Sequence, residues 1–184
     1  EEGKNIPVDI NKSIHYYSLA ANQNDSDAQY SLGYIYFSGK HIPIDIDKSI
    51  HYFTLSANQN NANAQFYLGI IYEDGKYVPI DINKSIHFYT LAANQNHAEA
   101  QHNLGLLYIQ NDFIQTDVEK TIHYLTLAAN SNISESQFNL GFLYLTNEHF
   151  PRDIKKAIYF ITLAANQNHL RAQYIIGLIY YGNE

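Results

Sequence analysis

Four histidines recur in this sequence at a constant spacing of 36 residues, as His15, His51, His87 and His123. Neutral imidazole is a common zinc ligand, so such a series first suggests a metal site. If each histidine occupies the same place in one of several stacked units, neighbouring rings lie about 8–10 Å apart, the distance between packed helices. Two imidazoles that share a zinc ion must each lie about 2.1 Å from it. The spacing therefore predicts no metal site and favours a row of solvated side chains.

Two other chemistries can be judged from residue types and spacing. The segment from Gly33 to Lys40 resembles a phosphate-binding loop, but its glycines are six residues apart instead of five, and no Ser or Thr follows the lysine. A Ser, His and Asp triad needs an asymmetric pocket, which near-identical units do not provide. The absence of cysteine excludes thiol chemistry and disulfides. We therefore expect a non-catalytic chain that carries no metal ion or other cofactor.

The histidines belong to a longer repeat. When the sequence is aligned with itself at 36 residues, ten columns are identical in all five copies. Self-similarity at a period of about 20–50 residues is the signature of a stacked-repeat architecture. In the first copy the ten invariant positions are Asp9, Lys12, Ile14, Leu19, Ala21, Asn22, Asn24, Gln29, Gly33 and Tyr36.

Each repeat predicts two helices. Small and apolar residues between Ser49 and Ala57 recur at helical spacing, after an aspartate, Asp45, that is suited to an N-cap. Asn60 follows, and Asn tolerates the left-handed backbone that ends many helices. The period predicts this helix, which we call helix B, at 9–22, 45–58, 81–94, 117–130 and 153–166. A similar stripe around Leu68 predicts a second helix, helix A, after each helix B.

A glycine stands inside every predicted helix A, at Gly33, Gly69, Gly105, Gly141 and Gly177. Glycine in a helix costs about 0.5–1 kcal/mol relative to alanine, so its repetition predicts a steric reason. We interpret the column as the crossing point of the paired helices, where the missing side chain lets the neighbour approach closely. The predicted units of helix B and helix A span about 9–44, 45–80, 81–116, 117–152 and 153–184, and no sheet is expected.

The segment ANAQFYLGIIYEDGKYVPIDINKSIHFYTLAANQN, residues 62–96, resembles a Sel1-like repeat, a relative of the tetratricopeptide repeat. The pattern of that family is A-x-A-Q-x-x-L-G-x-x-Y-x-x-G, then P, D-x-x-K-A and a closing A-A. This sequence departs from it by Asn at the end of helix B and by Ser or Thr after the lysine. The resemblance covers residues 1–184 as a single array and implies an all-α fold, a right-handed α-α superhelix (solenoid) of antiparallel helix pairs. Because the first residues align with the end of a helix A, we expect a segment of a longer array.

Helix A also carries a second apolar face. At 100° per residue, Tyr30, Tyr34 and Phe37 lie opposite the stripe that contains Ala28 and Leu32. One interpretation is that these side chains fill the interface between repeats. The other follows from the resemblance, which implies that helix A lines a concave surface where aromatic side chains would anchor a partner. The predicted partner-binding residues are Tyr30, Tyr34, Phe37, Phe66, Ile70, His102, Leu106, Phe138, Phe142 and Tyr174.

The resemblance implies a non-catalytic scaffold or adaptor that binds a protein or peptide on this surface. Two alternatives stay open: a regulatory or docking region of a larger enzyme such as a protein kinase, and a structural spacer or assembly element. Reading the residues on either side of the sequence, or sedimentation of the isolated segment, separates them. Near helix A the negatively charged residues are more numerous than the positively charged ones, of which Arg171 is the example, so they favour a basic partner. The negatively charged residues are Asp27, Glu73, Asp74, Glu99 and Glu135.

Bulk properties narrow the partners further. The formal net charge is −7, so a nucleic-acid partner is not expected. Apolar runs of only a few residues are far shorter than the roughly 20 that span a bilayer, so membrane insertion is not expected. A chain without cysteine fits a reducing compartment, and we expect the cytoplasm, with a lumenal location as the open alternative.

Overall fold

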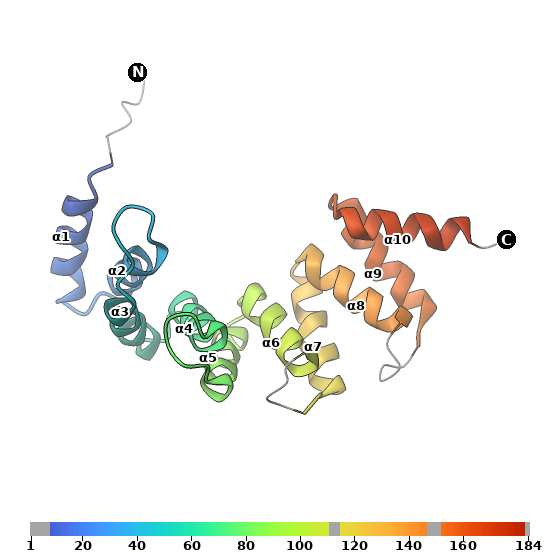
Figure 1. Ribbon diagram of the computed structural model, residues 1–184, viewed down its shortest axis with the longest axis horizontal. Helices are drawn as coiled ribbons and strands as arrows, with labels where there is room; N and C mark the ends of the chain where they lie inside the picture. Colours follow the sequence, from blue (N-terminus) through green and yellow to red (C-terminus); the bar gives the residue numbers. More distant parts are fainter. Residues whose placement is uncertain (1–7, 111–114, 147–151, 183–184) are drawn as a thin grey trace, which may run out of the picture. The chain divides into compact units, whose positions relative to one another are not determined.

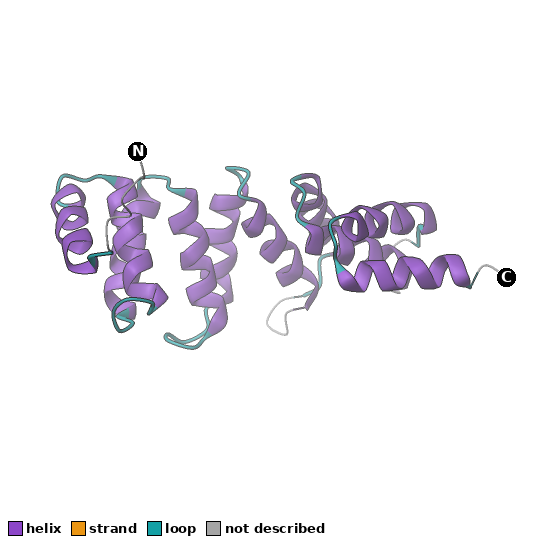
Figure 2. Cartoon of the chain, turned by 90° about the horizontal axis from the view of Figure 1, so that it is seen from above, coloured by secondary structure: helices purple, strands orange, loops and turns teal. Residues whose placement is uncertain are grey.

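The structure, a computed structural model, describes residues 8–110, 115–146 and 152–182. Within these ranges the chain forms ten α-helices and no strand (Figures 1 and 2). The odd-numbered helices are the predicted helix B segments: α1 (Ile10–Ala21), α3 (Ile46–Asn58), α5 (Ile82–Ala93), α7 (Val118–Asn130) and α9 (Ile154–Asn166). The even-numbered helices are helix A: α2 (Ser26–Ser38), α4 (Ala62–Asp74), α6 (Ala98–Gln110), α8 (Ser134–Thr146) and α10 (Leu170–Tyr181). The helix B prediction is confirmed, because every observed end lies within one residue of the predicted one.

The chain divides into two compact units, residues 1–92 and 93–184. The first holds α1 to α4 and α5 up to its last residue, and the second holds α6 to α10. In the first unit Phe53, Leu68 and Ile71 form a buried cluster. In the second, Leu125 and Leu140 belong to one buried cluster, and a further cluster is made by Phe138, Ile161, Ala164 and Ala172.

The invariant Asp, Lys and Tyr residues of the repeat contact one another at the start of helix B. The Asp45 side chain accepts the backbone N–H of Lys48 at 3.1 Å, and its second oxygen lies 2.8 Å from Lys48 Nζ. The same ammonium lies 5.0 Å from the ring centre of Tyr36. An N-cap contributes about 1 kcal/mol, whereas such an exposed ion pair contributes little. The cap recurs at Asp9, Asp81, Asp117 and Asp153.

The invariant Asn and Gln residues stabilise the turn that connects helix B to helix A. Asn24, Asn60, Asn96, Asn132 and Asn168 all have φ between 63° and 67°, which confirms the predicted left-handed geometry. In the fourth repeat Gln137 is buried and its Nε2 donates to the carbonyl of Ala129 at 3.0 Å and to Asn132 Oδ1 at 3.4 Å. Gly75 ends α4 with a left-handed φ of 68°.

The buried amide of Gln101 lacks the side-chain partner that its equivalents Gln29 and Gln137 have. Gln59 Nε2 donates to Gln29 Oε1 at 2.7 Å, and Gln167 repeats this bond to Gln137 at 2.7 Å. For Gln101 the donor position is occupied by Ser131, and Gln101 Oε1 is buried with no hydrogen-bond partner among the described residues. An unsatisfied buried acceptor carries its desolvation cost without compensation.

Ser131→Gln is therefore expected to raise the free energy of unfolding by about 0.5–1.5 kcal/mol, the net value of one hydrogen bond. Urea denaturation followed by circular dichroism measures the change. Ser131→Glu is the matched control, because its carboxylate has the same length but no N–H to donate. An equal gain for both variants would show that the new bond is not the cause.

The glycine column marks close helix crossings in four repeats, but the crossing helix is the following helix B and not the helix B of the same predicted unit; at Gly177 no described atom lies within 4 Å of a built Cβ. A Cβ atom built on Gly33 would lie 2.6 Å from the Phe53 ring of α3, and one on Gly69 would lie 2.5 Å from the Tyr89 ring of α5. Gly105 and Gly141 approach the following helix B in the same way. In these four repeats the glycine of helix A thus faces the helix B that comes next in the chain. The tightly packed pair is helix A with the following helix B.

Candidate protein-binding surface

In the first unit, the predicted residues of α2 converge on one side chain of α4. The rings of Tyr30, Tyr34 and Phe37 have centres 6.1, 5.5 and 5.4 Å from that of Tyr67. Tyr67 in turn stacks on buried Phe53 at 5.2 Å with nearly parallel planes. Tyr30 and Phe37 are half-buried, whereas Tyr34 is 44% exposed. These side chains therefore fill the space between α2 and α4, and Tyr34 extends this aromatic cluster to the surface.

The predicted residues of α4, Phe66 and Ile70, are half-buried. The Phe66 ring centre lies 5.8 Å from that of Tyr89 in α5. Near the end of α4, Tyr89 Oη donates a 2.7 Å hydrogen bond to the Glu73 carboxylate. Burial raises the pKa of Glu73, and the Tyr89 hydrogen bond opposes that change. Glu73 therefore takes up a proton more readily than an exposed glutamate does.

In the second unit the predicted residues are mostly covered. His102 of α6 is half-buried, its Nδ1 lies 2.7 Å from Ser136 Oγ, and burial lowers its pKa. Leu106 packs against the cluster around Leu125 and Leu140. These contacts make His102 and Leu106 parts of the interface between neighbouring repeats.

Phe138 of α8 is only 2% exposed, so it belongs to the core and presents no surface to a partner. Its ring stacks on His169 at 4.7 Å, and the Arg171 guanidinium lies 5.0 Å from the ring centre. Phe142 stacks on Phe138 at 5.7 Å and is half-buried. Tyr174 of α10, which occupies the same column as Phe138, is instead 67% exposed. Of the ten predicted residues, Tyr34 and Tyr174 are the two that reach solvent most fully.

Acidic residues lie at the start of helix A. Asp27, Glu99 and Glu135 occupy the first turns of α2, α6 and α8, where the helix dipole stabilises a negative charge. Asp27 Oδ1 accepts a 3.2 Å hydrogen bond from Asn61 Nδ2, and Glu135 Oε2 lies 2.8 Å from His169 Nε2. These interactions stabilise the first turns of the helices. Because the three carboxylates are exposed, they also add negative potential near those turns.

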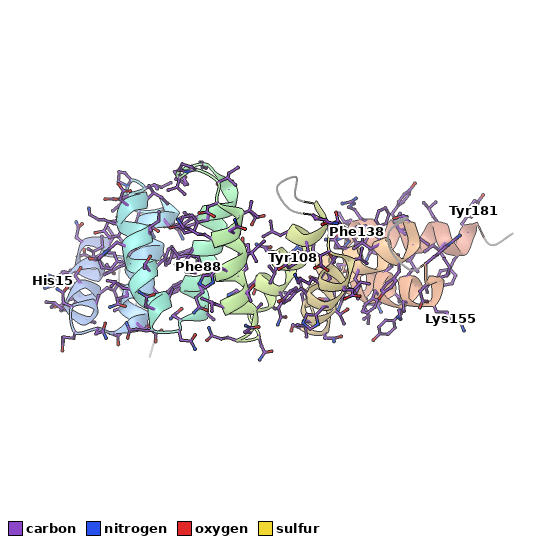
Figure 3. The ribbon with its side chains drawn as sticks, turned by 90° about the horizontal axis from the view of Figure 1, so that it is seen from below. His15, Phe88, Tyr108, Phe138, Lys155 and Tyr181 are labelled. Carbon is purple, nitrogen blue, oxygen red and sulfur yellow. The ribbon has the colours of Figure 1, made fainter. Side chains whose placement is uncertain are left out.

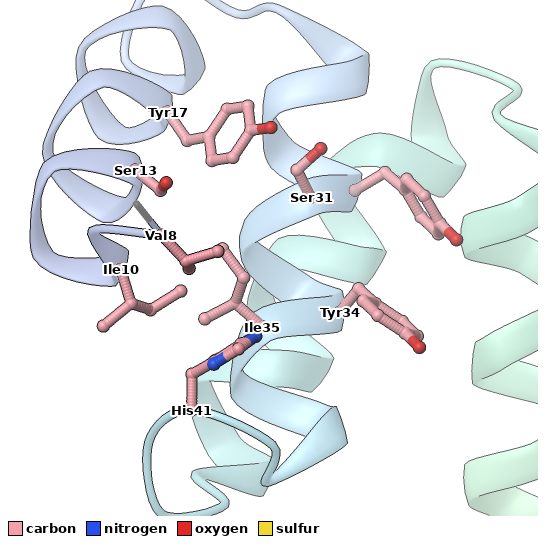
Figure 4. A pocket seen from close by; sticks show the side chains of 9 residues that line it. Val8, Ile10, Ser13, Tyr17, Ser31, Tyr34, Ile35 and His41 are labelled. Atoms are coloured by element: carbon pink, nitrogen blue, oxygen red, sulfur yellow. The ribbon is translucent and has the colours of Figure 1, made fainter. Parts of the chain in front are cut away.

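A pocket of about 290 Å³ lies between α1 and α2 (Figure 4). Tyr17 of α1 and Tyr34 and Ser31 of α2 line it, and His41 lies at one side. Sequence analysis did not predict this pocket. The sequence does indicate extra space here, because the small residue Ser31 stands in the column where the next repeat has the large residue Tyr67.

The recurring histidines lie outside this surface. His15, His51, His87 and His123 are exposed on helix B, and each ring meets the edge of the aromatic residue that follows it. Across the described ranges, no group of three His, Cys, Asp or Glu side chains is arranged to hold a metal ion. No helix there is both long and apolar enough to cross a membrane.

The family model for the Sel1 repeat matches residues 1–25, 26–61, 62–97, 98–133 and 134–169. Its complete repeats begin at helix A and end after the following helix B, which is the tightly packed pair of the glycine column. A comparison with curated protein sequences found no match.

Three solved structures are similar. A Sel1 repeat protein from Oxalobacter formigenes is 24% identical, with a TM-score of 0.79 over 92% of this chain and 68% of the other. A protective antigen of uropathogenic Escherichia coli that displays an SLR fold is 28% identical, with a TM-score of 0.83 over 92% of this chain and 36% of the antigen. A Sel1 repeat protein from Klebsiella pneumoniae is 16% identical, with a TM-score of 0.58 over 91% of this chain and 83% of the other.

These matches and the ten helices confirm the predicted all-α solenoid with its 36-residue period. Because the family model covers nearly the whole sequence in five consecutive copies, the chain belongs to the Sel1 repeat family.

Proposed function

We propose that this chain is a scaffold that binds a protein segment on the helix A side, with Tyr34 as the apolar anchor. Sel1 repeat proteins generally act as protein-interaction scaffolds. The observation that carries the proposal here is Tyr34, which is 44% exposed while its ring is held against Tyr30 and Tyr67. A rigid aromatic ring loses little conformational entropy on binding, so it suits a contact that dominates affinity.

The charge beside Tyr34 favours a partner with basic residues. Asp27 precedes Tyr34 by seven residues, which places it on the same side of α2 about two turns away. Asp25 caps the same helix and is also exposed. The proposed ligand is a peptide or protein segment with an apolar side chain for Tyr34 and a Lys or Arg for Asp27. Within the first unit, the half-buried rings of Tyr30 and Phe37 pack against Tyr67 beside Tyr34 and support its position.

Selection from a displayed peptide library tests the proposal with defined ligands. We expect the chain to enrich peptides that combine aromatic or aliphatic residues with Lys or Arg. Tyr34→Ser should weaken binding of the selected peptides by about tenfold or more, the effect of losing a contact worth over 1 kcal/mol. It should lower the melting temperature by only a few degrees, because the ring is 44% exposed and loses only its contacts with Tyr30 and Tyr67.

Tyr159→Ser is the matched control, because Tyr159 is 59% exposed on α9, a helix B. We expect this variant to bind the selected peptides as wild type does. If no peptide is enriched, or if the two Tyr→Ser variants bind equally, Tyr34 is not the anchor and the proposal fails.

A further inference from the structure

One contact between neighbouring repeats of the second unit carries a histidine where the other repeats have Tyr or Phe. We propose that the contact between His102 of α6 and Ser136 of α8 is an acid-sensitive switch, which holds α6 against α8 at neutral pH and weakens when the ring takes up a proton. Tyr34 lies in the first unit, so this switch is independent of the proposed peptide binding.

Elsewhere in the array this contact consists of an aromatic ring and an alanine. In the first unit Tyr30 of α2 packs against the buried cluster that contains Ala64 of α4. In the second unit Phe138 of α8, which is labelled in Figure 3, belongs to one buried cluster with Ala172 of α10. Each pair joins a helix A to the helix A of the next repeat, and each is apolar apart from the Tyr30 hydroxyl.

Both members of the pair are different between α6 and α8. His102 occupies the Tyr or Phe column, and Ser136 stands where the equivalent residues are alanine. His102 Nδ1 lies 2.7 Å from Ser136 Oγ, and Ser136 is fully buried. Among the described residues Ser136 Oγ has no other hydrogen-bond partner. With Nδ1 unprotonated, the neutral ring accepts the Ser136 O–H, so both groups are satisfied without a charge.

Protonation of this ring costs free energy at the contact. A charged imidazole can only donate, so the Ser136 hydroxyl must turn to accept and its own hydrogen loses its partner. The charge also lies in a half-buried place, where it is poorly solvated. Burial accordingly lowers the pKa of His102, whereas the charges of Glu135 and Glu99 act in the opposite direction. The contact therefore favours the neutral ring.

Glu135 of α8 and Glu99 of α6 are the charged groups among the described residues that act on the ring, and α7 supplies none. Each carboxylate also faces another histidine. Glu135 Oε2 lies 2.8 Å from His169 Nε2, and Glu99 Oε2 lies 3.4 Å from His97 Nδ1. Both glutamate side chains are more than half exposed, so water and salt screen their charges. This is why burial outweighs the two carboxylates at His102.

The direction of the pH dependence follows from the lowered pKa of His102. Above the ordinary histidine value of 6.5 the ring is neutral in the folded and in the unfolded chain, so no stability depends on it. Below 6.5 the unfolded chain takes up the proton first, so the folded state becomes less stable as the pH falls. The equivalent pair of the first unit, Tyr30 and Ala64, has no group that titrates near neutral pH. Acid should therefore loosen α6 and α8 more than α2 and α4.

A double variant that restores the apolar pair tests the switch. His102→Phe with Ser136→Ala recreates the combination that Phe138 and Ala172 form. Between about pH 7.5 and about pH 5.5 the melting temperature of wild type should fall by a few degrees more than that of the double variant. The double variant keeps every other histidine, so the difference belongs to this pair. An equal fall in both chains would contradict the proposal.

Hydrogen exchange locates the change, once the intrinsic pH dependence of exchange has been subtracted. On acidification we expect the amides of α6 and α8 in wild type to lose protection severalfold relative to those of α2 and α4 in the same molecules. The double variant should show no such difference between the units. Equal losses in both units of wild type would show that the acid response does not lie at His102.

A direct titration keeps the test independent of how the variant folds. NMR of the imidazole carbons of the wild-type chain measures the pKa of His102, which we expect below 6.5. A value at or above 6.5 would overturn the proposal, because a ring that takes up a proton as readily in the folded chain as in the unfolded one does not weaken the contact. Neither substitution alters Tyr34, so peptide binding can succeed or fail independently of the acid response.

Discussion

Gly105→Leu is expected to lower the free energy of unfolding by about 1–3 kcal/mol, the usual cost of overpacking a well-packed site. A Cβ at this position would lie 2.8 Å from Leu125 Cγ and 3.1 Å from the backbone nitrogen of Leu125. The side chain of Leu125 can turn away, but its backbone nitrogen moves only if α7 shifts. This steric cost outweighs the gain of roughly 1 kcal/mol or less that leucine brings as a better helix former.

The same substitution at Gly177 is the matched control, since Gly177 occupies the same column without a neighbour within 4 Å in the described chain. Here only helix propensity acts, and we expect a gain of up to about 1 kcal/mol. Urea denaturation followed by circular dichroism measures both variants. If Gly105→Leu were as stable as wild type, the close crossing at α6 and α7 would not explain the glycine column.

The helices could be predicted from sequence because their signals are local. Asp45 caps α3, Asn60 follows its end with a positive φ, and both residues recur at every equivalent position. The partner of each glycine could not be predicted in the same way. A period of 36 residues places Gly33 on helix A, but it does not determine whether the preceding or the following helix B lies against it. That choice depends on three-dimensional packing, and the structure assigns it to the following helix.

The binding surface was less predictable, because residues in one column do not share one environment. Tyr67 lies at the centre of the aromatic cluster in the first unit, yet its column also holds Ser31, Asn103 and Asn139, so no repetition marks it. Exposure to solvent also differs within a single column, because Phe138 is buried whereas Tyr174 at the equivalent position is exposed. A self-alignment treats such positions as equal, although the helices that cover them differ.

Phe138→Ala is expected to lower the free energy of unfolding by about 3–5 kcal/mol, the usual cost of removing a buried phenylalanine ring. The ring is 2% exposed and packs with Ile161, Ala164 and Ala172, and His169 stacks on it. Both the apolar transfer free energy and the cavity left behind contribute to this cost.

Tyr174→Ala supplies the comparison within the same column. Because Tyr174 is 67% exposed, its removal should change the free energy of unfolding by no more than about 0.5 kcal/mol. Thermal and urea melts of the two variants separate a packing role from a surface role at one position of the repeat. If Phe138→Ala were no less stable than Tyr174→Ala, the ring of Phe138 would not be part of the core, and the prediction from sequence that Phe138 contacts a partner would regain its basis.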